Sequence, residues 1–306
     1  MTDKAIEAKA LGKDFNGARA VKDLNLQVKH GEIYGLVGPD GAGKTTTMRL
    51  LSTVISPTSG AAQVLGMDII KESEKIKEKI GYMPQQFSLY GDLTVEENLN
   101  FYADLYKMPK PEREKKKIEL YEFSKLEPFK SRLAQNLSGG MKKKLALACT
   151  LIHTPELLFL DEPTTGVDPL SRRELWRILY SLVPKITIFV STPYMDEAER
   201  CNEVGLMYNG SILLSSDPVS IKAQLKGRIL NVKCNKIRDA RDLLKKLAEV
   251  KKVELFGDRL HVEVLDIHTG SLVITSKLKE AGIEVIDIRE TVPNLEDVFV
   301  SLMTKS

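Results

Sequence analysis

A glycine-rich loop between a short apolar run and a longer apolar-periodic run constrains this chain more than any other feature. Residues 38–45 read GPDGAGKT and fit the pattern G-x-x-x-x-G-K-[ST]. Residues 32–37, EIYGLV, predict a buried strand, and residues 44–56 predict a helix that Pro57 and Gly60 end. A strand that runs through such a loop into a helix is typical of a phosphate-binding site.

The residue types of this loop explain how it would hold a phosphate. Glycines let backbone N–H groups curl around an anion, and the helix adds the positive end of its dipole. Lys44 supplies a mobile positive charge for the β- and γ-phosphates of a nucleotide, and the Thr45 hydroxyl can ligate Mg²⁺. The residues expected to bind the nucleotide here are Gly38, Pro39, Asp40, Gly41, Ala42, Gly43, Lys44, Thr45 and Thr46.

Two acids end a second apolar run. Residues 157–160, LLFL, predict a buried strand, and Asp161 and Glu162 follow it directly. Open α/β sheets bind ligands at the carboxyl ends of their strands, so Asp161 is expected to hold Mg²⁺ through water. Glu162 is expected to polarise the attacking water, a role worth about 10²–10⁴ in rate. The alternative is a pair of ordinary surface acids.

A third motif precedes a helix. Residues 137–141 read LSGGM, in which Ser138 is a natural N-cap, while Gly139 and Gly140 leave the amides of the first turn exposed. These residues predict a second phosphate-binding helix N-terminus. The alternative is a flexible helix start.

Length and patterning predict two domains in 306 residues. Strands and helices alternate from Pro155, and Asp168-Pro169 predicts a capped helix, so we expect an α/β domain with a mostly parallel sheet. From residue 228 the order β-α-β-β-α-β predicts a small α+β ferredoxin-like domain, with a helix at 240–250 and the boundary between residues 226 and 227.

Composition excludes several classes of protein. The net charge of +3 gives no electrostatic argument for binding nucleic acid. Cys149, Cys201 and Cys234 form no CxxC pair, so neither a disulfide framework nor a zinc site is expected. The N-terminal residues lack the apolar core of a signal peptide, and no run is long enough to span a bilayer. We therefore expect a soluble chain. If it acts at a membrane, another protein must supply the membrane-spanning segments.

The three motifs, in this order, resemble the ATP-binding cassette (ABC) family of nucleotide-binding subunits, over about residues 5–225. The resemblance implies the P-loop NTPase fold, with an antiparallel N-terminal β part and a helical subdomain at about 86–153, and the cofactors ATP and Mg²⁺. It also implies that Phe15 stacks on adenine and that Gln85 contacts Mg²⁺ and the attacking water. The alternative for Phe15 is an aromatic side chain that only packs, and the alternative for Gln85 is a solvated amide. Gln86 could take the role of Gln85 instead.

The resemblance further implies partners. Two cassettes would face each other head to tail, with ATP between Gly38–Thr46 of one and Ser138–Gly140 of the other, while the loop of Asp168 crosses to the partner. ATP binding would close this pair of cassettes and hydrolysis would open it. A membrane permease would convert that cycle into transport, and it would contact the cassette near residues 87–92, at the cytoplasmic face of the membrane. The LSGGM variant and the C-terminal domain resemble the branch that exports drugs and polysaccharides.

One position departs from the family pattern. Residues 190–193 read VSTP, so Pro193 stands where the family usually has a histidine that donates to the γ-phosphate. Proline has no side-chain donor, and the loss could cost about 10²–10³ in rate. The alternative is that Pro193 merely starts a helix well.

We therefore expect slow hydrolysis at this chain's own site and favour pairing with a different or fused cassette over a homodimer. A non-hydrolytic regulatory half-cassette is the main competing function. A soluble ABC ATPase that acts on ribosomes or DNA is a weaker one.

Overall fold

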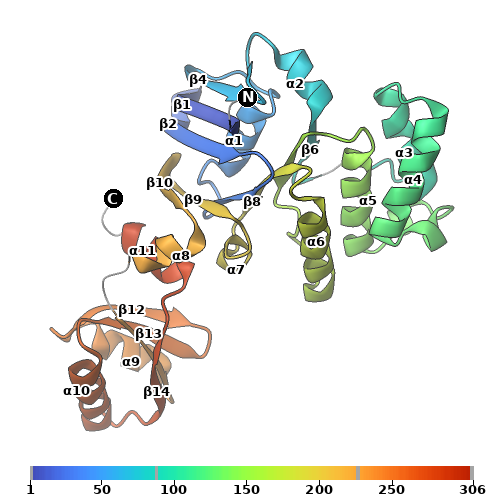
Figure 1. Ribbon diagram of the computed structural model, residues 1–306. Helices are drawn as coiled ribbons and strands as arrows, with labels where there is room; N and C mark the ends of the chain where they lie inside the picture. Colours follow the sequence, from blue (N-terminus) through green and yellow to red (C-terminus); the bar gives the residue numbers. More distant parts are fainter. Residues whose placement is uncertain (1–2, 87–88, 225–227, 304–306) are drawn as a thin grey trace. The chain divides into compact units, whose positions relative to one another are not determined.

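A six-stranded sheet forms the centre of the first of two units, Met1–Pro218 and Val219–Ser306. The computed structural model describes residues 3–86, 89–224 and 228–303, so the expected boundary at 226–227 lies outside the described residues. The strand order is β10-β9-β3-β8-β7-β6. Figure 1 labels β10, β9, β8 and β6 of this sheet. Five strands are parallel and β10 is antiparallel, which confirms the predicted mostly parallel sheet. The strands are β3 (Ile33–Val37), β6 (Ile80–Met83), β7 (Leu157–Asp161), β8 (Thr187–Thr192), β9 (Glu203–Tyr208) and β10 (Ser211–Ser216).

A second, antiparallel sheet is built from the N-terminal part of the chain. Its order is β2-β1-β4-β5, from β1 (Lys4–Phe15), β2 (Ala18–Lys29), β4 (Ser59–Val64) and β5 (Met67–Asp68). Leu24, Leu26 and Val28 are buried while their neighbours in β2 are exposed, as the alternating sequence predicts. These side chains share one hydrophobic core with Met48 of α1 (Lys44–Leu51) and Phe159 of the central sheet.

The helix after the glycine-rich loop is shorter than predicted. It ends at Leu51 and not near Ser56, because Ser52 takes the C-cap position and Thr53 has a left-handed φ of 61°. The helix contacts both sheets, which fixes its N-terminus at the end of β3. A further short helix, α2 (Ser73–Lys79), leads into β6.

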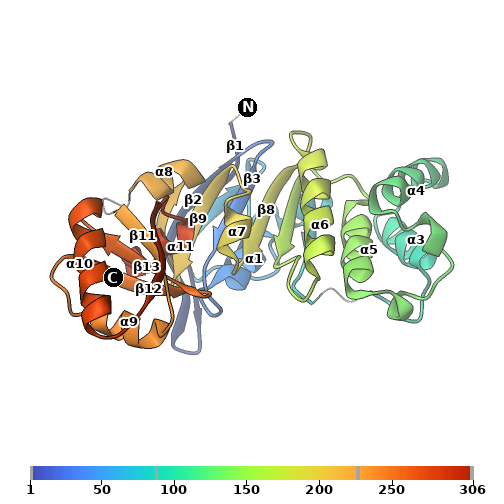
Figure 2. The same cartoon turned by 90° about the horizontal axis from the view of Figure 1, so that it is seen from below.

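Three helices form a group beside the end of the central sheet (Figures 1 and 2). They are α3 (Val95–Leu105), α4 (Lys110–Ser124) and α5 (Gly139–Leu151). Thr94 and Glu97 cap α3 with reciprocal hydrogen bonds, the capping box that the T-x-x-E spacing of these residues predicts. Helix α5 contacts α3, α4 and β6, so it joins the helical group to the sheet. Among the described residues, no helix is long and apolar enough to cross a bilayer.

Two helices follow strands of the central sheet. Helix α6 (Pro169–Leu182) begins after Asp168, whose carboxylate accepts the amides of Leu170 and Ser171, and this N-cap confirms the prediction. Helix α7 (Met195–Ala198) has Tyr194 as its N-cap. Pro193 therefore precedes the cap, and the alternative prediction that it starts the helix is wrong.

The second unit has the ferredoxin-like order that the sequence predicts. It contains β11 (Arg228–Cys234), α9 (Ile237–Leu244), β12 (Val250–Phe256), β13 (Arg259–Val264), α10 (Ile267–Glu280), β14 (Val285–Thr291) and α11 (Leu295–Met303), after α8 (Pro218–Ala223). The sheet order is β12-β13-β11-β14, and every pairing is antiparallel. The helix predicted at 240–250 lies at 237–244, because Val250 pairs with Val264 and so begins a strand.

Candidate active site

The glycine-rich loop makes a tight curve between β3 and α1, and this curve requires glycine at two positions. A Cβ at Gly38 would lie 2.1 Å from the carbonyl oxygen of Met207, and one at Gly43 would lie 2.5 Å from that of Ala20. Gly43 also has a φ of 106°, which side chains rarely adopt. The loop therefore packs against β2 and β9 only with glycine at these positions.

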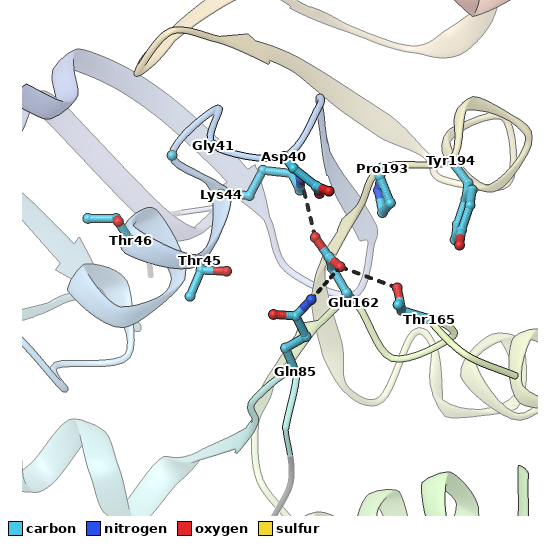
Figure 3. A pocket seen from close by; sticks show the side chains of 11 residues that line it. Asp40, Gly41, Lys44, Thr45, Thr46, Gln85, Glu162, Thr165, Pro193 and Tyr194 are labelled. Carbon is cyan, nitrogen blue, oxygen red and sulfur yellow. Dashed lines mark hydrogen bonds and ion pairs between the residues drawn. The ribbon is translucent and has the colours of Figure 1, made fainter. Parts of the chain in front are cut away.

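A cavity of about 610 Å³ opens over this loop (Figure 3). Lys44 is buried beside it, and its ammonium donates to the carbonyl oxygens of Gly38 at 2.8 Å and Pro39 at 3.0 Å. The same ammonium lies 3.3 Å from Glu162 Oε1. The cavity is lined by Asp40, Gly41, Gly43, Lys44, Thr45, Thr46, Gln85, Glu162, Thr165, Pro193 and Tyr194.

Glu162 is the centre of the polar contacts in this cavity. Its Oε2 accepts a hydrogen bond from Gln85 Nε2 at 2.9 Å and a longer one from Thr165 Oγ1 at 3.3 Å. Its φ of 48° turns the backbone sharply at the end of β7, and its amide donates to Ser191 Oγ at 3.0 Å. A buried carboxylate that is oriented by three groups and opens on a cavity suits a general base.

Asp161 does not line the cavity but lies buried one residue before Glu162. One carboxylate oxygen accepts a 2.6 Å hydrogen bond from Ser191 Oγ. The other, Oδ2, is buried and has no hydrogen-bond partner among the described residues. Thr45 and Gln85 line the cavity itself, and their hydroxyl and amide oxygens, with the orphaned carboxylate oxygen of Asp161, are the types of oxygen ligand that Mg²⁺ prefers.

Seven of the residues expected to bind the nucleotide do not line this cavity: Gly38, Pro39 and Ala42 of the loop, and Phe15, Ser138, Gly139 and Gly140. Phe15 is 45% exposed at the end of β1, where the ammonium of Lys13 lies 5.2 Å from the centre of its ring. Ser138 caps α5 through the Met141 amide, and Gly139 lines a second cavity, of about 400 Å³, together with Gln85. The first cavity therefore brings together the phosphate loop, Gln85 and Glu162, but neither Phe15 nor Ser138, Gly139 and Gly140.

A buried network supports the wall of the cavity that carries Pro193. Glu197 is buried and accepts hydrogen bonds from Thr192 at 2.7 Å and Thr164 at 2.9 Å. Arg172 of α6 donates to its other oxygen at 2.8 Å and lies 4.5 Å from the ring centre of Tyr194. This network was not predicted, because its members are separated in sequence.

Sequence reasoning also missed two residues that line the cavity and one that hydrogen-bonds both acids. Thr165 lies shortly after Glu162 in the sequence, and Tyr194 directly follows Pro193. This closeness to predicted residues was the one signal in the sequence that could have identified them. Ser191 gave no signal, although it binds both acids, through the Asp161 carboxylate and the Glu162 amide.

Comparisons with known proteins place both units in described families. Residues 21–165 match the ABC transporter family, and residues 217–303 match the C-terminal domain of DrrA1-3-like ATP-binding proteins. The chain is 41% identical to the probable multidrug ABC transporter ATP-binding protein YbhF of Escherichia coli, over 99% of its own length and 53% of the relative's. It thus spans about half of that protein.

Two further relatives match along nearly their whole length. The daunorubicin/doxorubicin resistance ATP-binding protein DrrA of Streptomyces peucetius is 32% identical, with 98% of this chain and 92% of the relative covered. The linearmycin resistance ATP-binding protein LnrL of Bacillus subtilis is 33% identical, with 97% of each covered.

Solved structures share the fold of the first unit. The structure of cbiO1 from Clostridium perfringens matches with a TM-score of 0.67 and 28% identity, over 72% of this chain and 92% of that one. The cassette MJ0796, in a dimeric post-hydrolysis state bound to ADP and Pi, matches with a TM-score of 0.64 and 26% identity, over 69% and 98%.

Proposed function

The chain belongs to the ATP-binding proteins of ABC transporters, and from this premise we propose that it powers export of a small, drug-like molecule or another substrate through a separate permease. The names of DrrA and LnrL, both drug-resistance ATP-binding proteins, support an exporter. The single observation that carries the ATPase role is the cavity in which Lys44 and Gln85 both contact Glu162.

The residues of the cavity have distinct proposed roles in ATP hydrolysis. Lys44 and the loop 38–46 hold the phosphates, and Glu162 accepts the proton of the attacking water that Gln85 helps to orient. Thr45, Gln85 and Asp161 would hold Mg²⁺, which when bound would neutralise charge on the phosphates. Phe15 would stack on the adenine.

A second cassette completes the proposed site. Ser138, Gly139 and Gly140 lie apart from the chain's own cavity, as expected of groups that contact nucleotide held by a partner cassette. We favour a different or fused partner, with the loop of Asp168 crossing to it. The near-double length of YbhF supports a fused arrangement. ATP binding would close the pair, and hydrolysis would open it.

The permease is proposed to dock at the cytoplasmic face of the membrane, beside Gln85. The cavity of about 400 Å³ includes Leu89 and Gly91 of the segment predicted for this contact. Residues 87 and 88 of that segment lie outside the described residues. The proposed division of labour is an ATP-binding domain at 1–226, whose helical subdomain at about 86–153 faces the permease, and an accessory domain at 227–306.

Hydrolysis at this chain's own site is proposed to be slow. Among the described residues, those that line the cavity include no histidine, and Pro193 stands at the wall where a donor to the γ-phosphate is expected. The same observation favours the second candidate function, a regulatory cassette that binds ATP without turning it over.

Calorimetry with magnesium and ATP tests the proposal. The folded chain should bind Mg·ATP, and Lys44→Met should weaken binding by about tenfold or more, because a charge-assisted contact to phosphate is lost. Lys22→Met, an exchange outside the cavity, is the control. Absence of any heat of association for a well-folded sample would overturn the proposal.

The two candidate functions are separated by turnover. Turnover that appears when a permease and partner cassette are added supports the exporter. Binding with negligible turnover beside the same partners supports the regulatory cassette.

A further inference from the structure

Gln85 takes part in two hydrogen bonds, one through its side chain and one through its backbone. Its side-chain amide donates to Glu162 Oε2 at 2.9 Å, and its backbone carbonyl accepts from the ammonium of Lys143 at 3.1 Å. Lys143 lies on α5, the helix that Ser138 caps, so a continuous chain of contacts links this helix to the proposed catalytic base.

Lys143 differs from the two lysines beside it. Lys144 pairs with Glu174 of α6, and the side chain of Lys142 has no polar partner in the described part of the chain. Both Lys142 and Lys143 line the cavity of about 400 Å³ that includes Gln85, so the hydrogen bond to Gln85 is what distinguishes Lys143. Burial lowers the pKa of its ammonium, while the charges of Glu162 and Asp161 oppose that shift. The ammonium of Lys143 therefore interacts electrostatically with both acids, although its hydrogen bond is to a carbonyl group.

We propose that Lys143 is a positioning residue, which ties the backbone of Gln85 to helix α5 and so holds the Gln85 amide against Glu162. The inference rests on the proposed function, because it assigns Lys143 a task in that same site. A movement of α5 would be transmitted through Lys143 to Gln85 and from there to Glu162. Without the tie, the Gln85 amide samples positions away from Glu162, and misplaced groups lower the rate of a reaction more than they lower binding.

NMR relaxation of the Gln85 side-chain amide, in the isotope-labelled full chain without nucleotide, is the first test. Lys143→Met keeps the aliphatic stem but removes the donor, and it should lower the order parameter of this amide to below about 0.6, the range of a flexible group. Lys143→Arg should restore most of the order. Lys142→Met, on the same helix and lining the same cavity, is the matched control and should leave it unchanged.

Turnover of Mg·ATP is the second readout. Lys143→Met should lower kcat by about tenfold and leave KM within about twofold, since the phosphate loop is untouched. If the order parameter of the Gln85 side-chain amide is the same in Lys143→Met and the parent chain, or if Lys142→Met gives an equal change, the proposal is overturned. Relaxation is measured without nucleotide, so it tests the Lys143–Gln85 contact even where turnover is too slow to follow. A chain that fails to bind ATP instead overturns the proposed function.

Discussion

Ser191 Oγ donates a 2.6 Å hydrogen bond to Asp161 Oδ1 and accepts the amide of Glu162 at 3.0 Å. A single hydroxyl on β8 thus holds both acids at the end of the neighbouring strand β7. All three residues are buried, so water cannot replace a lost bond easily.

Ser191→Ala should lower the free energy of unfolding of the first unit by about 1–3 kcal/mol, because it leaves a buried carboxylate and a buried amide without this partner. Trp176 is the only tryptophan in the sequence and is buried in that unit, so its fluorescence follows the unfolding of this unit in denaturant. Ser131→Ala, at an exposed position, is the control and should change stability by less than about 0.5 kcal/mol. Equal stability of the two variants would contradict the bridging role.

Glu162→Gln should reduce ATP turnover by about 10²–10⁴ and retain nucleotide binding, since the amide keeps the shape of the side chain but cannot accept a proton. Steady-state turnover and calorimetry on the same preparation separate the two effects. Turnover equal to that of the parent chain would show that another group acts as the base.

Pro193→His should raise turnover by about 10²–10³, because it supplies a donor at the wall of the cavity. The measurement compares single-turnover hydrolysis in the two proteins. If the parent chain hydrolyses ATP rapidly and Pro193→His leaves the rate unchanged, a defect at Pro193 would be contradicted.

Arg172→Met should destabilise the first unit by about 3 kcal/mol, because it removes the cation that is paired with the buried carboxylate of Glu197. Arg173→Met is the matched control, since its side chain is exposed on the same helix turn. Tryptophan fluorescence in denaturant again reports the unit concerned, and a similar loss in both variants would argue against a specific role for the Glu197 network.

His153 should make the first unit sensitive to acid. Burial lowers the pKa of its imidazole below the ordinary value, although the carbonyl of Ile80 opposes this. The folded state therefore binds this proton less readily than the unfolded state, and stability is lost as the pH falls through the unfolded pKa of about 6.5. His153→Phe, which keeps a ring against Tyr106, should flatten the slope of stability with pH, by up to about 1.4 kcal/mol per pH unit, below about pH 6.5. An unchanged slope would contradict this assignment.

Local signals in the sequence predicted the elements that depend on neighbours along the chain. The caps at Thr94, Ser138 and Asp168 were correct because a cap requires only a side chain and the amides two or three residues ahead. The helix predicted at 240–250 was wrong because periodicity cannot show that Val250 pairs with Val264 in the sheet.

Contacts between distant segments could not be predicted in the same way. Ser191 lies 30 residues from Asp161, and Lys143 lies 58 residues from Gln85. Serine and lysine are common on exposed surfaces, so neither residue type drew attention by itself. The resemblance to a family supplied the roles of Gln85 and Glu162, but it gave no information about the groups that hold them.

Evolution toward greater thermostability would act against the proposed base. A left-handed backbone at Glu162 is unfavourable for an L-residue by about 1–2 kcal/mol, whereas glycine adopts it freely. Glycine at this position would therefore relax the turn, but it would also remove the carboxylate that the proposed hydrolysis requires.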